Sequence, residues 1–359
     1  MTKAKSRFFL LITIFLSFSI FSCKKNIEAK SQKILGTICT INLYEGGTEK
    51  IYKKLFDCLF EIDKIFNPYR EDSEIFFVNK NAGKNEIEVS DEFAFVLNAA
   101  LFISETTDGA FDPALGAVVD AWGINNKQNE LPADAAPPES AVLKNALKNS
   151  HWKLVELSHS NGKNFLKIPK GLKIDLGGIV KGYASDCLEK ILKKENVKCA
   201  VINLGGNIYL HGQKTDGSPW LVGVKDPKNP EGNPAISLTG LKNTSIVTSG
   251  VYERFFSHNG KLFHHIIDPK TGEPSENGIV SVTVICPRSI FADALATAFL
   301  VMGADEAFKK IDILNYAQEF RGENRPLLIA ITETGKIIAS EELKGIAGLF
   351  LDDYTLEFQ

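Results

Sequence analysis

Short β-prone runs separated by turn residues fill the chain after residue 150, and they constrain the fold more than any other feature. Helical spacing of apolar residues interrupts them at 179–194 and 291–302. Strands that cluster without strict alternation with helices indicate an α+β architecture with mostly antiparallel sheets flanked by helices. The predicted strands are 152–157, 164–168, 172–174, 200–203, 220–224, 245–248, 262–267, 280–285 and 326–331.

The first half of the chain is predicted to be mainly helical. Apolar residues at helical spacing mark 48–66 and 90–107, and Ser90 is placed to cap the second helix. Residues 128–140 are rich in proline and alanine and predict a surface loop. With 359 residues and 44% hydrophobic content, the chain can bury one large core or two smaller ones. We expect two packed lobes with a site between them.

The amino terminus predicts an export signal over residues 1–22. Basic residues precede an apolar run at 8–21, which is short for a membrane-spanning helix. The run ends in Ile20-Phe21-Ser22-Cys23, which resembles a bacterial lipobox, although Phe21 is bulkier than the usual residue. We therefore expect lipid on Cys23. The alternative is an ordinary secretory signal that happens to contain a cysteine, and both interpretations place the protein outside the cytoplasm.

After the signal we expect a polar tether at 23–34 and a single functional domain at 35–359. A lipidated Cys23 predicts attachment to a membrane on its periplasmic face, with the inner membrane favoured over the outer. A net charge of −3 without a dense basic stretch makes nucleic acid an unexpected partner. The remaining cysteines form no C-x-x-C pair and are odd in number, so we expect buried apolar residues and neither disulfides nor zinc. They are Cys39, Cys58, Cys187, Cys199 and Cys286.

Widespread catalytic motifs are missing from the sequence. It has no G-x-G-x-x-G, G-x-x-x-x-G-K-[ST], H-E-x-x-H or G-x-S-x-G, which removes the usual support for common nucleotide sites, zinc proteases and serine hydrolases. Clusters of Asp, Gly, Thr and His in predicted loops remain. Residues of these types in loops favour a functional site.

One such cluster runs from a predicted strand into the helix at 179–194. Gly177 and Gly178 allow the backbone to approach a ligand, and Lys181 lies near the start of the helix, where an anion is favoured. These residues indicate a phosphate site. The alternative is a plain glycine turn between a strand and a helix.

Asp293 and Thr297 lie four residues apart on the helix predicted at 291–302 and therefore share one face. A carboxylate, a hydroxyl and a backbone carbonyl form the kind of oxygen set that Mg²⁺ accepts. The alternative is that Asp293 caps its helix while Thr297 bonds the helix backbone.

His265 lies in the strand before the Asp268-Pro269 turn. It is either a proton shuttle or a structural histidine.

Taken together and in order, these motifs resemble the ApbE family of FAD:protein FMN transferases. The resemblance extends from Gly36 to about Gly303 and includes DLGGIVKG at 175–182, NLGG at 203–206 and ADALAT at 292–297. Leu35 stands where the family commonly has methionine, and Gly178 where alanine is common. The other landmarks are 35–37, Tyr69, 72–74, Asn79, 109–113, 122–123, 226–227, 248–254, 265–272 and 302–303.

The resemblance implies a role for each matching residue. Asp293, Thr297 and the backbone carbonyl of Gly178 are expected to bind Mg²⁺, which would bridge the pyrophosphate of FAD. His265 and Asp293 are expected to be catalytic. The residues expected to contact FAD are Leu35, Tyr69, Ala110, Phe111, Asp112, Asp175, Lys181 and Ile267.

The expected reaction moves FMN from FAD onto a threonine hydroxyl of a partner protein and releases AMP. The partners implied by the family are membrane redox subunits that carry the acceptor threonine. Two alternatives remain open from the sequence. One is an Mg²⁺-dependent pyrophosphatase in which water replaces threonine and gives FMN and AMP, and the other is a lipoprotein that binds flavin without chemistry.

Overall fold

The computed structural model describes residues 28–124, 135–314, 318–320 and 325–359. The predicted signal peptide, Cys23, the first part of the predicted tether and residues 128–134 of the loop predicted at 128–140 lie outside the described residues. Within the described part of the chain, no helix is both long and apolar enough to cross a membrane.

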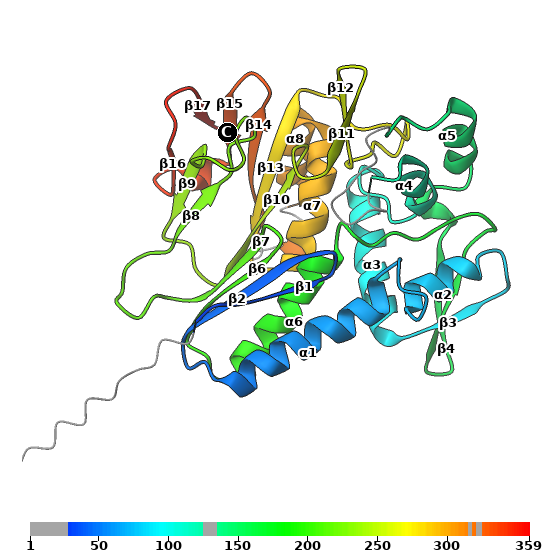
Figure 1. The fold of residues 1–359 in the computed structure, drawn as a ribbon, viewed down its shortest axis with the longest axis horizontal. Coiled ribbons are helices and arrows are strands. Elements are labelled where there is room, and N and C mark those ends of the chain that lie inside the picture. The colour runs from blue at the N-terminus through cyan, green and yellow to red at the C-terminus, as the bar shows by residue number, and fades with distance from the viewer. Residues whose placement is uncertain (1–27, 125–134, 315–317, 321–324) are drawn as a thin grey trace, which may run out of the picture.

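A nine-stranded sheet forms the centre of the structure (Figure 1). Neighbouring strands in it are antiparallel, except that β15 and β17 run parallel. Its strands, in spatial order, are β1 (Lys30–Ile34), β2 (Thr37–Glu45), β6 (Cys199–Leu204), β7 (Asn207–Gly212), β10 (Thr244–Gly250), β13 (Ile279–Cys286), β14 (Leu327–Thr332), β15 (Lys336–Ala339) and β17 (Thr355–Phe358).

Three helices form a layer on one face of this sheet. α7 (Ser289–Met302) packs on β10 and β13, α6 (Val180–Lys194) packs on α7, and α1 (Glu49–Phe66) packs on α6. Nearly every side chain of α7 is buried, because it lies between the sheet and the other helices. The burial of this helix fixes the position of any group that it carries.

A second group of elements comes from the chain between α1 and α6. It comprises α2 (Glu74–Lys80), β3 (Ile87–Val89), α3 (Asp91–Thr106), α4 (Gly116–Trp122), α5 (Ser140–Leu147), β4 (Glu156–Ser160) and β5 (Lys163–Lys167). The three strands pair in the order β3-β5-β4. One hydrophobic cluster runs from this helical part through α1, α6 and α7 to the large sheet.

Smaller elements complete the structure. On the opposite face of the large sheet, β8 (Leu221–Val224), β9 (Ile236–Thr239) and β16 (Ala347–Leu349) form a three-stranded sheet over a second core. β11 (Phe255–His258) and β12 (Lys261–His264) form a separate hairpin, and α8 (Ala304–Leu314) follows α7. The predicted α+β class with mostly antiparallel sheets is confirmed.

The long predicted helices agree with the structure to within two residues at each end. Thr48 and Ser90 accept hydrogen bonds from backbone amides at the starts of α1 and α3, as N-caps do. Three strand predictions were wrong in part. Residues 152–154 form a short 3₁₀ helix before β4, residues 172–174 contribute only an isolated bridge through Lys173, and β12 ends at His264.

The five described cysteines are free thiols, and they differ in burial. Cys39, Cys199 and Cys286 are buried, as the sequence predicts, whereas Cys58 and Cys187 are only partly buried. The prediction that all five are buried was therefore wrong for Cys58 and Cys187.

Candidate active site

The segment before α6 is held in place by α2 and by the loop that follows α3. The Asn79 side chain donates to the Ile174 carbonyl oxygen (2.9 Å) and accepts from the Ile174 amide (2.7 Å). The next amide, that of Asp175, donates to the Pro113 carbonyl oxygen (2.8 Å). These bonds satisfy the backbone of a strand-like segment that belongs to no sheet, which explains why it is ordered without being a regular strand.

Asp175 shapes the turn that leads into α6. Its carboxylate accepts a hydrogen bond from the Gly177 amide (2.7 Å). Burial raises the pKa of Asp175, and the negative charge of Asp120 raises it further, whereas Arg254 and Lys181 act in the opposite direction. The carboxylate therefore lies among charges of both signs at the start of the helix.

Asp293 faces the first turn of α6 and does not cap its own helix. Its side chain is nearly buried, with one oxygen accepting from the Gly182 amide (2.9 Å) and the other 3.3 Å from the Lys181 ammonium nitrogen. A Cβ atom on Gly182 would lie 2.8 Å from that of Asp293, so only glycine allows this approach. The predicted metal ligand Asp293 and the predicted phosphate contact Lys181 therefore lie side by side.

The cap of α7 comes instead from Asp186 on α6. Its carboxylate accepts hydrogen bonds from the Ser289 amide (2.7 Å) and the Ile290 amide (3.2 Å). Burial raises the pKa of Asp186 to about 6. The two helices are therefore joined at two places, by Asp186 at the start of α7 and by Asp293 about one turn later.

Gly178 and Thr297 meet beside the ring of Phe111. A Cβ atom on Gly178 would lie 3.0 Å from the Phe111 ring and 3.5 Å from the Thr297 hydroxyl oxygen. The Thr297 hydroxyl is also 3.3 Å from that of Ser249 on β10. The backbone of Gly178, the hydroxyl of Thr297 and the carboxylate of Asp293, one helical turn before Thr297, thus converge on the start of α6.

This set of groups fits a hard cation better than zinc. Among the described residues, no group of three His, Cys, Asp or Glu side chains is arranged to hold a metal ion. A cation at Asp293 would therefore take a single carboxylate, together with hydroxyl and carbonyl oxygens, which are ligands typical of Mg²⁺. The Asp293 carboxylate forms an ion pair with the Lys181 ammonium group, so positive charge is already favoured at this position.

His265 lies just after β12. Its Nδ1 atom is 3.3 Å from the Arg254 carbonyl oxygen, which can only accept, so Nδ1 carries the proton and Nε2 is left as an acceptor. Burial lowers the pKa of His265 to about 3, and the positive charges of Arg254 and Lys181 contribute. The imidazole is therefore neutral at physiological pH, and the neighbouring His264 bonds the Ser275 carbonyl oxygen instead (3.0 Å).

The predicted contacts Ala110, Phe111 and Asp112 form one turn beside Gly178. Both carboxylate oxygens of Asp112 accept backbone hydrogen bonds, one from Ala114 (2.8 Å) and one from Trp152 (3.0 Å). Burial raises the pKa of Asp112. The carboxylate stabilises the turn, which leaves the Phe111 ring and the local backbone to face the site.

Tyr69 stands at the outer side of the site with 53% of its surface exposed. Partial burial raises the pKa of Tyr69, as do the negative charges of Asp175 and Asp120, whereas the positive charge of Arg254 opposes the change. Asp120 forms an ion pair with Lys173 (2.5 Å). Nothing in the sequence singles out Asp120. Its neighbours Lys173 and Tyr69 are distant in the chain and come close to it only in the fold.

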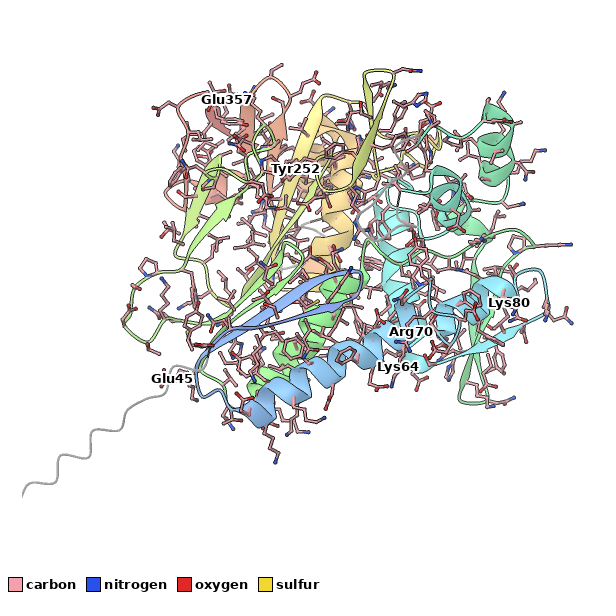
Figure 2. The ribbon with its side chains drawn as sticks, viewed as in Figure 1. Glu45, Lys64, Arg70, Lys80, Tyr252 and Glu357 are labelled. Atoms are coloured by element: carbon pink, nitrogen blue, oxygen red, sulfur yellow. The ribbon has the colours of Figure 1, made fainter. Side chains whose placement is uncertain are left out.

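Asp63, which the sequence does not single out either, joins two of the predicted contacts. Its carboxylate accepts from the Leu35 amide (3.2 Å) and pairs with Arg70 (3.4 Å), next to Tyr69. Figure 2 labels Arg70 just beyond the end of α1. Leu35 itself has a positive φ of 54°, in the turn between β1 and β2.

Ile267 is buried and packs in a third cluster with Trp122 and Phe256. The Trp122 indole donates to the Gly272 carbonyl oxygen (2.7 Å), which fixes the turn after Ile267. Because the side chain faces this core, any contact that Ile267 makes with a ligand comes from its backbone.

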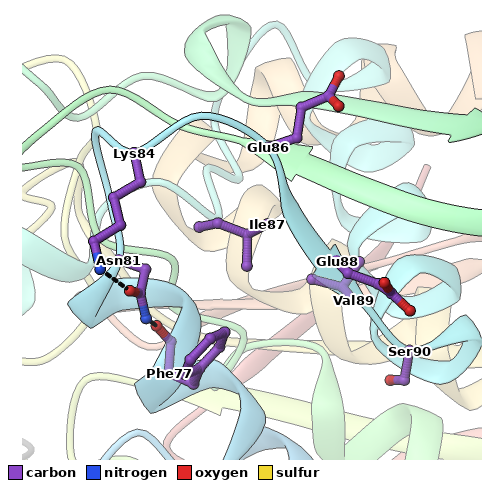
Figure 3. Close-up of a pocket in the computed structure, with 8 residues that line it drawn as sticks. All are labelled: Phe77, Asn81, Lys84, Glu86, Ile87, Glu88, Val89 and Ser90. Atoms are coloured by element: carbon purple, nitrogen blue, oxygen red, sulfur yellow. Dashed lines mark hydrogen bonds between the residues drawn. The ribbon is translucent and has the colours of Figure 1, made fainter.

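A surface hollow of about 550 Å³ lies elsewhere, between α2 and β3 (Figure 3). Lys84 donates to Asn81 there (2.6 Å), and Asn81 donates to the Phe77 carbonyl oxygen (2.7 Å). None of the predicted site residues lines this hollow. Its lining consists of Phe77, Asn81, Lys84, Glu86, Ile87, Glu88, Val89 and Ser90.

Comparison with known proteins finds relatives that share most of the length of this chain. An FAD:protein FMN transferase of Treponema pallidum is 32% identical over 295 residues, covering 78% of this chain and 80% of the relative. Its counterpart in Haemophilus influenzae is 30% identical over 319 residues, covering 86% and 90%.

Solved structures show the same fold. The ApbE protein of Thermotoga maritima is 30% identical with a TM-score of 0.77, covering 89% of this chain and 98% of that one. The flavin transferase ApbE of Vibrio cholerae is 25% identical with a TM-score of 0.72 and covers the same shares of the two chains. The model of the ApbE family matches residues 35–318, and the chain belongs to this family.

Proposed function

We propose that the protein is an Mg²⁺-dependent FAD:protein FMN transferase. The observation that carries the proposal is the meeting of Asp293, Thr297 and Gly178 at the start of α6, beside Lys181. A threonine hydroxyl oxygen of the acceptor bonds to the FMN phosphorus of FAD, the bond from that phosphorus to the bridging oxygen breaks, and AMP leaves. FMN stays on the acceptor as a phosphate ester.

Asp293, the Thr297 hydroxyl and the Gly178 carbonyl would hold Mg²⁺. The bound ion would neutralise charge on the pyrophosphate and polarise the phosphoryl group. Lys181 lies beside Asp293. Its ammonium group would bind a phosphate oxygen of FAD. Tyr69, Phe111, Asp175 and the backbone near Leu35, Ala110, Asp112 and Ile267 would hold the rest of FAD.

His265 suits the role of general base. Its imidazole is neutral because its pKa is lowered, and its Nε2 atom has no proton. That atom would accept the proton of the acceptor hydroxyl as the oxygen bonds to phosphorus. A protonated histidine could not do this, whereas the neutral imidazole can, although a pKa near 3 makes it a weaker base than an ordinary histidine.

The acceptor is proposed to be a redox protein at the membrane to which the enzyme is attached by lipid on Cys23. This part of the proposal rests on the amino-terminal sequence, which supports export and lipidation. Attachment on the periplasmic face, with the inner membrane preferred, would bring enzyme and acceptor together.

The proposal is tested by incubating the protein with FAD, Mg²⁺ and a fragment of a flavoprotein that contains the acceptor threonine. AMP release and flavin fluorescence on the denatured acceptor are followed together. Flavin on the acceptor in an amount equal to AMP supports the transferase. AMP with free FMN, for every acceptor fragment offered, identifies a pyrophosphatase, and FAD binding without AMP identifies a flavin carrier.

A further inference from the structure

Ser249 lies near the end of β10, on the face of the large sheet that α7 covers (Figure 1). Side chains alternate between the two faces of a strand, and Val247, two residues earlier, is buried in the hydrophobic cluster that includes α7. Val282, the residue paired with Ser249 on β13, belongs to the same cluster. Ser249 therefore places a hydroxyl beside apolar neighbours on the helix side of the sheet.

This hydroxyl is directed at the proposed metal site. Its oxygen lies 3.3 Å from the hydroxyl oxygen of Thr297 on α7. The Thr297 oxygen in turn lies 3.5 Å from the position that a Cβ atom on Gly178 would take, and Asp293 is one turn earlier on the same helix. Ser249 therefore contacts the proposed site through Thr297.

A hydroxyl has one proton and two lone pairs, which limits how Thr297 can act as a ligand. When its oxygen gives a lone pair to a cation, its proton must point away from the cation and needs an acceptor. The Ser249 oxygen is in position to be that acceptor. Partners of this kind orient a metal ligand and make it a better donor.

A second acceptor is possible in principle. Threonine in a helix can donate to the carbonyl oxygen four residues earlier, which here belongs to Asp293. That bond would orient the Thr297 hydroxyl without Ser249. The two arrangements make different predictions for a variant that lacks the Ser249 hydroxyl.

We propose that Ser249 is a positioning residue for the metal site. Its oxygen accepts the proton of Thr297 and thereby turns a lone pair of the Thr297 oxygen toward Mg²⁺. This inference rests on the function proposed above. Because 3.3 Å exceeds the roughly 2.8 Å typical of a bond between hydroxyls, we expect the two oxygens to move closer when the ion binds.

The opposite face of the same strands offers a matched control. The Thr283 hydroxyl oxygen on β13 lies 2.8 Å from that of Thr248 on β10. Ile285, two residues after Thr283, is buried in the second core, on the side of the sheet away from α7. The change Thr283→Val therefore breaks a pair of hydroxyls on β10 without touching the proposed site.

The test compares Ser249→Ala, Ser249→Thr and Thr283→Val with the original full-length chain in detergent. Isothermal titration calorimetry with MgCl₂ measures metal affinity, and AMP release from FAD is followed as a function of Mg²⁺ concentration. We expect Ser249→Ala to weaken Mg²⁺ binding by about tenfold. Its rate of AMP release should recover at saturating Mg²⁺, and its FAD affinity without metal should be unchanged.

Ser249→Thr keeps the hydroxyl and should restore Mg²⁺ affinity, whereas Thr283→Val should retain the original affinity. Circular dichroism and thermal unfolding verify that each variant is folded. The positioning role is overturned, and the proposed function left intact, if the original chain binds Mg²⁺ and Ser249→Ala binds it equally well. An equal loss of affinity in Thr283→Val, or a loss of rate in Ser249→Ala that persists at saturating Mg²⁺, would also overturn it. Failure of the original chain to bind Mg²⁺ would contradict the proposed function as well as this inference.

Discussion

Asp293 contacts two partners, the Gly182 amide and the Lys181 ammonium group, through its two carboxylate oxygens. The change Asp293→Asn keeps an acceptor for the amide but removes the charge that a divalent cation needs. We expect AMP release to fall by about 100-fold or more, because a loss of about 3 kcal/mol in the transition state has that effect. Calorimetry should show a parallel loss of Mg²⁺ affinity.

The control for this change is Asp305→Asn, which neutralises an exposed aspartate in the first turn of α8. It should leave both Mg²⁺ affinity and AMP release close to those of the original chain. Equal Mg²⁺ affinity in the Asp293 and Asp305 variants would remove Asp293 from the proposed metal site.

His265 gives a prediction about pH. Its pKa is about 3 in the folded protein and near 6.5 in the unfolded chain, so protons bind more tightly to the unfolded state. The stability that His265 contributes is therefore complete above pH 6.5 and is lost as the pH falls toward 3. Urea unfolding at pH 7.5 and pH 5 should show a smaller loss for His265→Gln than for the original chain.

The same variant tests the role of His265 in the reaction. Loss of a general base typically lowers the rate by about 100-fold or more. We expect His265→Gln to lower the rate of flavin transfer on this scale and to leave FAD affinity, measured by fluorescence titration, nearly unchanged. A transfer rate within twofold of the original would contradict the role of base.

At the scale of elements, the start of α7 is capped by Asp186, a residue of another helix, α6. The change Asp186→Ala leaves the buried amides of Ser289 and Ile290 without acceptors, and a buried unsatisfied donor costs about 1–3 kcal/mol. We expect the free energy of unfolding to fall by roughly 2–4 kcal/mol. Asp186→Asn keeps one acceptor and should cost less, and an equal loss in both variants would show that the hydrogen bonds are unimportant.

Asp63, near the end of α1, connects this helix to the turn that contains Leu35 and to the loop that contains Tyr69. The change Asp63→Ala breaks both connections, so we expect FAD affinity to fall by about tenfold, which corresponds to about 1.4 kcal/mol. The control is Asp57→Ala on the same helix, which removes an exposed pair with Lys53 and should change little. Unchanged FAD affinity in both variants would mean that Asp63 is only structural.

At the scale of the whole molecule, FAD and Mg²⁺ should stabilise the fold together, because the proposed site joins α6, α7 and the helical part. A ligand at 100 times its Kd adds about 2.7 kcal/mol to the free energy of unfolding. We expect the midpoint of thermal unfolding to rise by several degrees with both ligands present and by less when EDTA removes the metal. A rise that EDTA leaves unchanged would argue against a metal between FAD and the protein.

Local sequence signals predict much of the fold and part of the site. Helical spacing places Asp293 and Thr297 on one face of a helix, and the structure confirms that helix. The caps at Thr48 and Ser90 are also local, since each bonds an amide three residues away. Such features depend on neighbours in the sequence and can be inferred without the fold.

Contacts between distant segments could not be inferred in this way. The amide of Ser289 is capped by Asp186, about 100 residues earlier in the chain, and nothing near either residue signals this pairing. Asn79 likewise binds the backbone of Ile174 across a long interval. The resemblance to a family marks Asn79 as a landmark, but only the packing of α2 against this segment explains why an amide side chain is needed there.

The edge of the large sheet begins with β1 at Lys30, only a short distance along the chain from Cys23. If lipid is attached at Cys23, the intervening backbone can extend to at most about 25 Å. The first strand of the folded domain would then stay close to the bilayer surface. The height of the active site above the bilayer would be limited to this length plus the span of the folded domain, so an acceptor threonine farther from the membrane would stay out of reach.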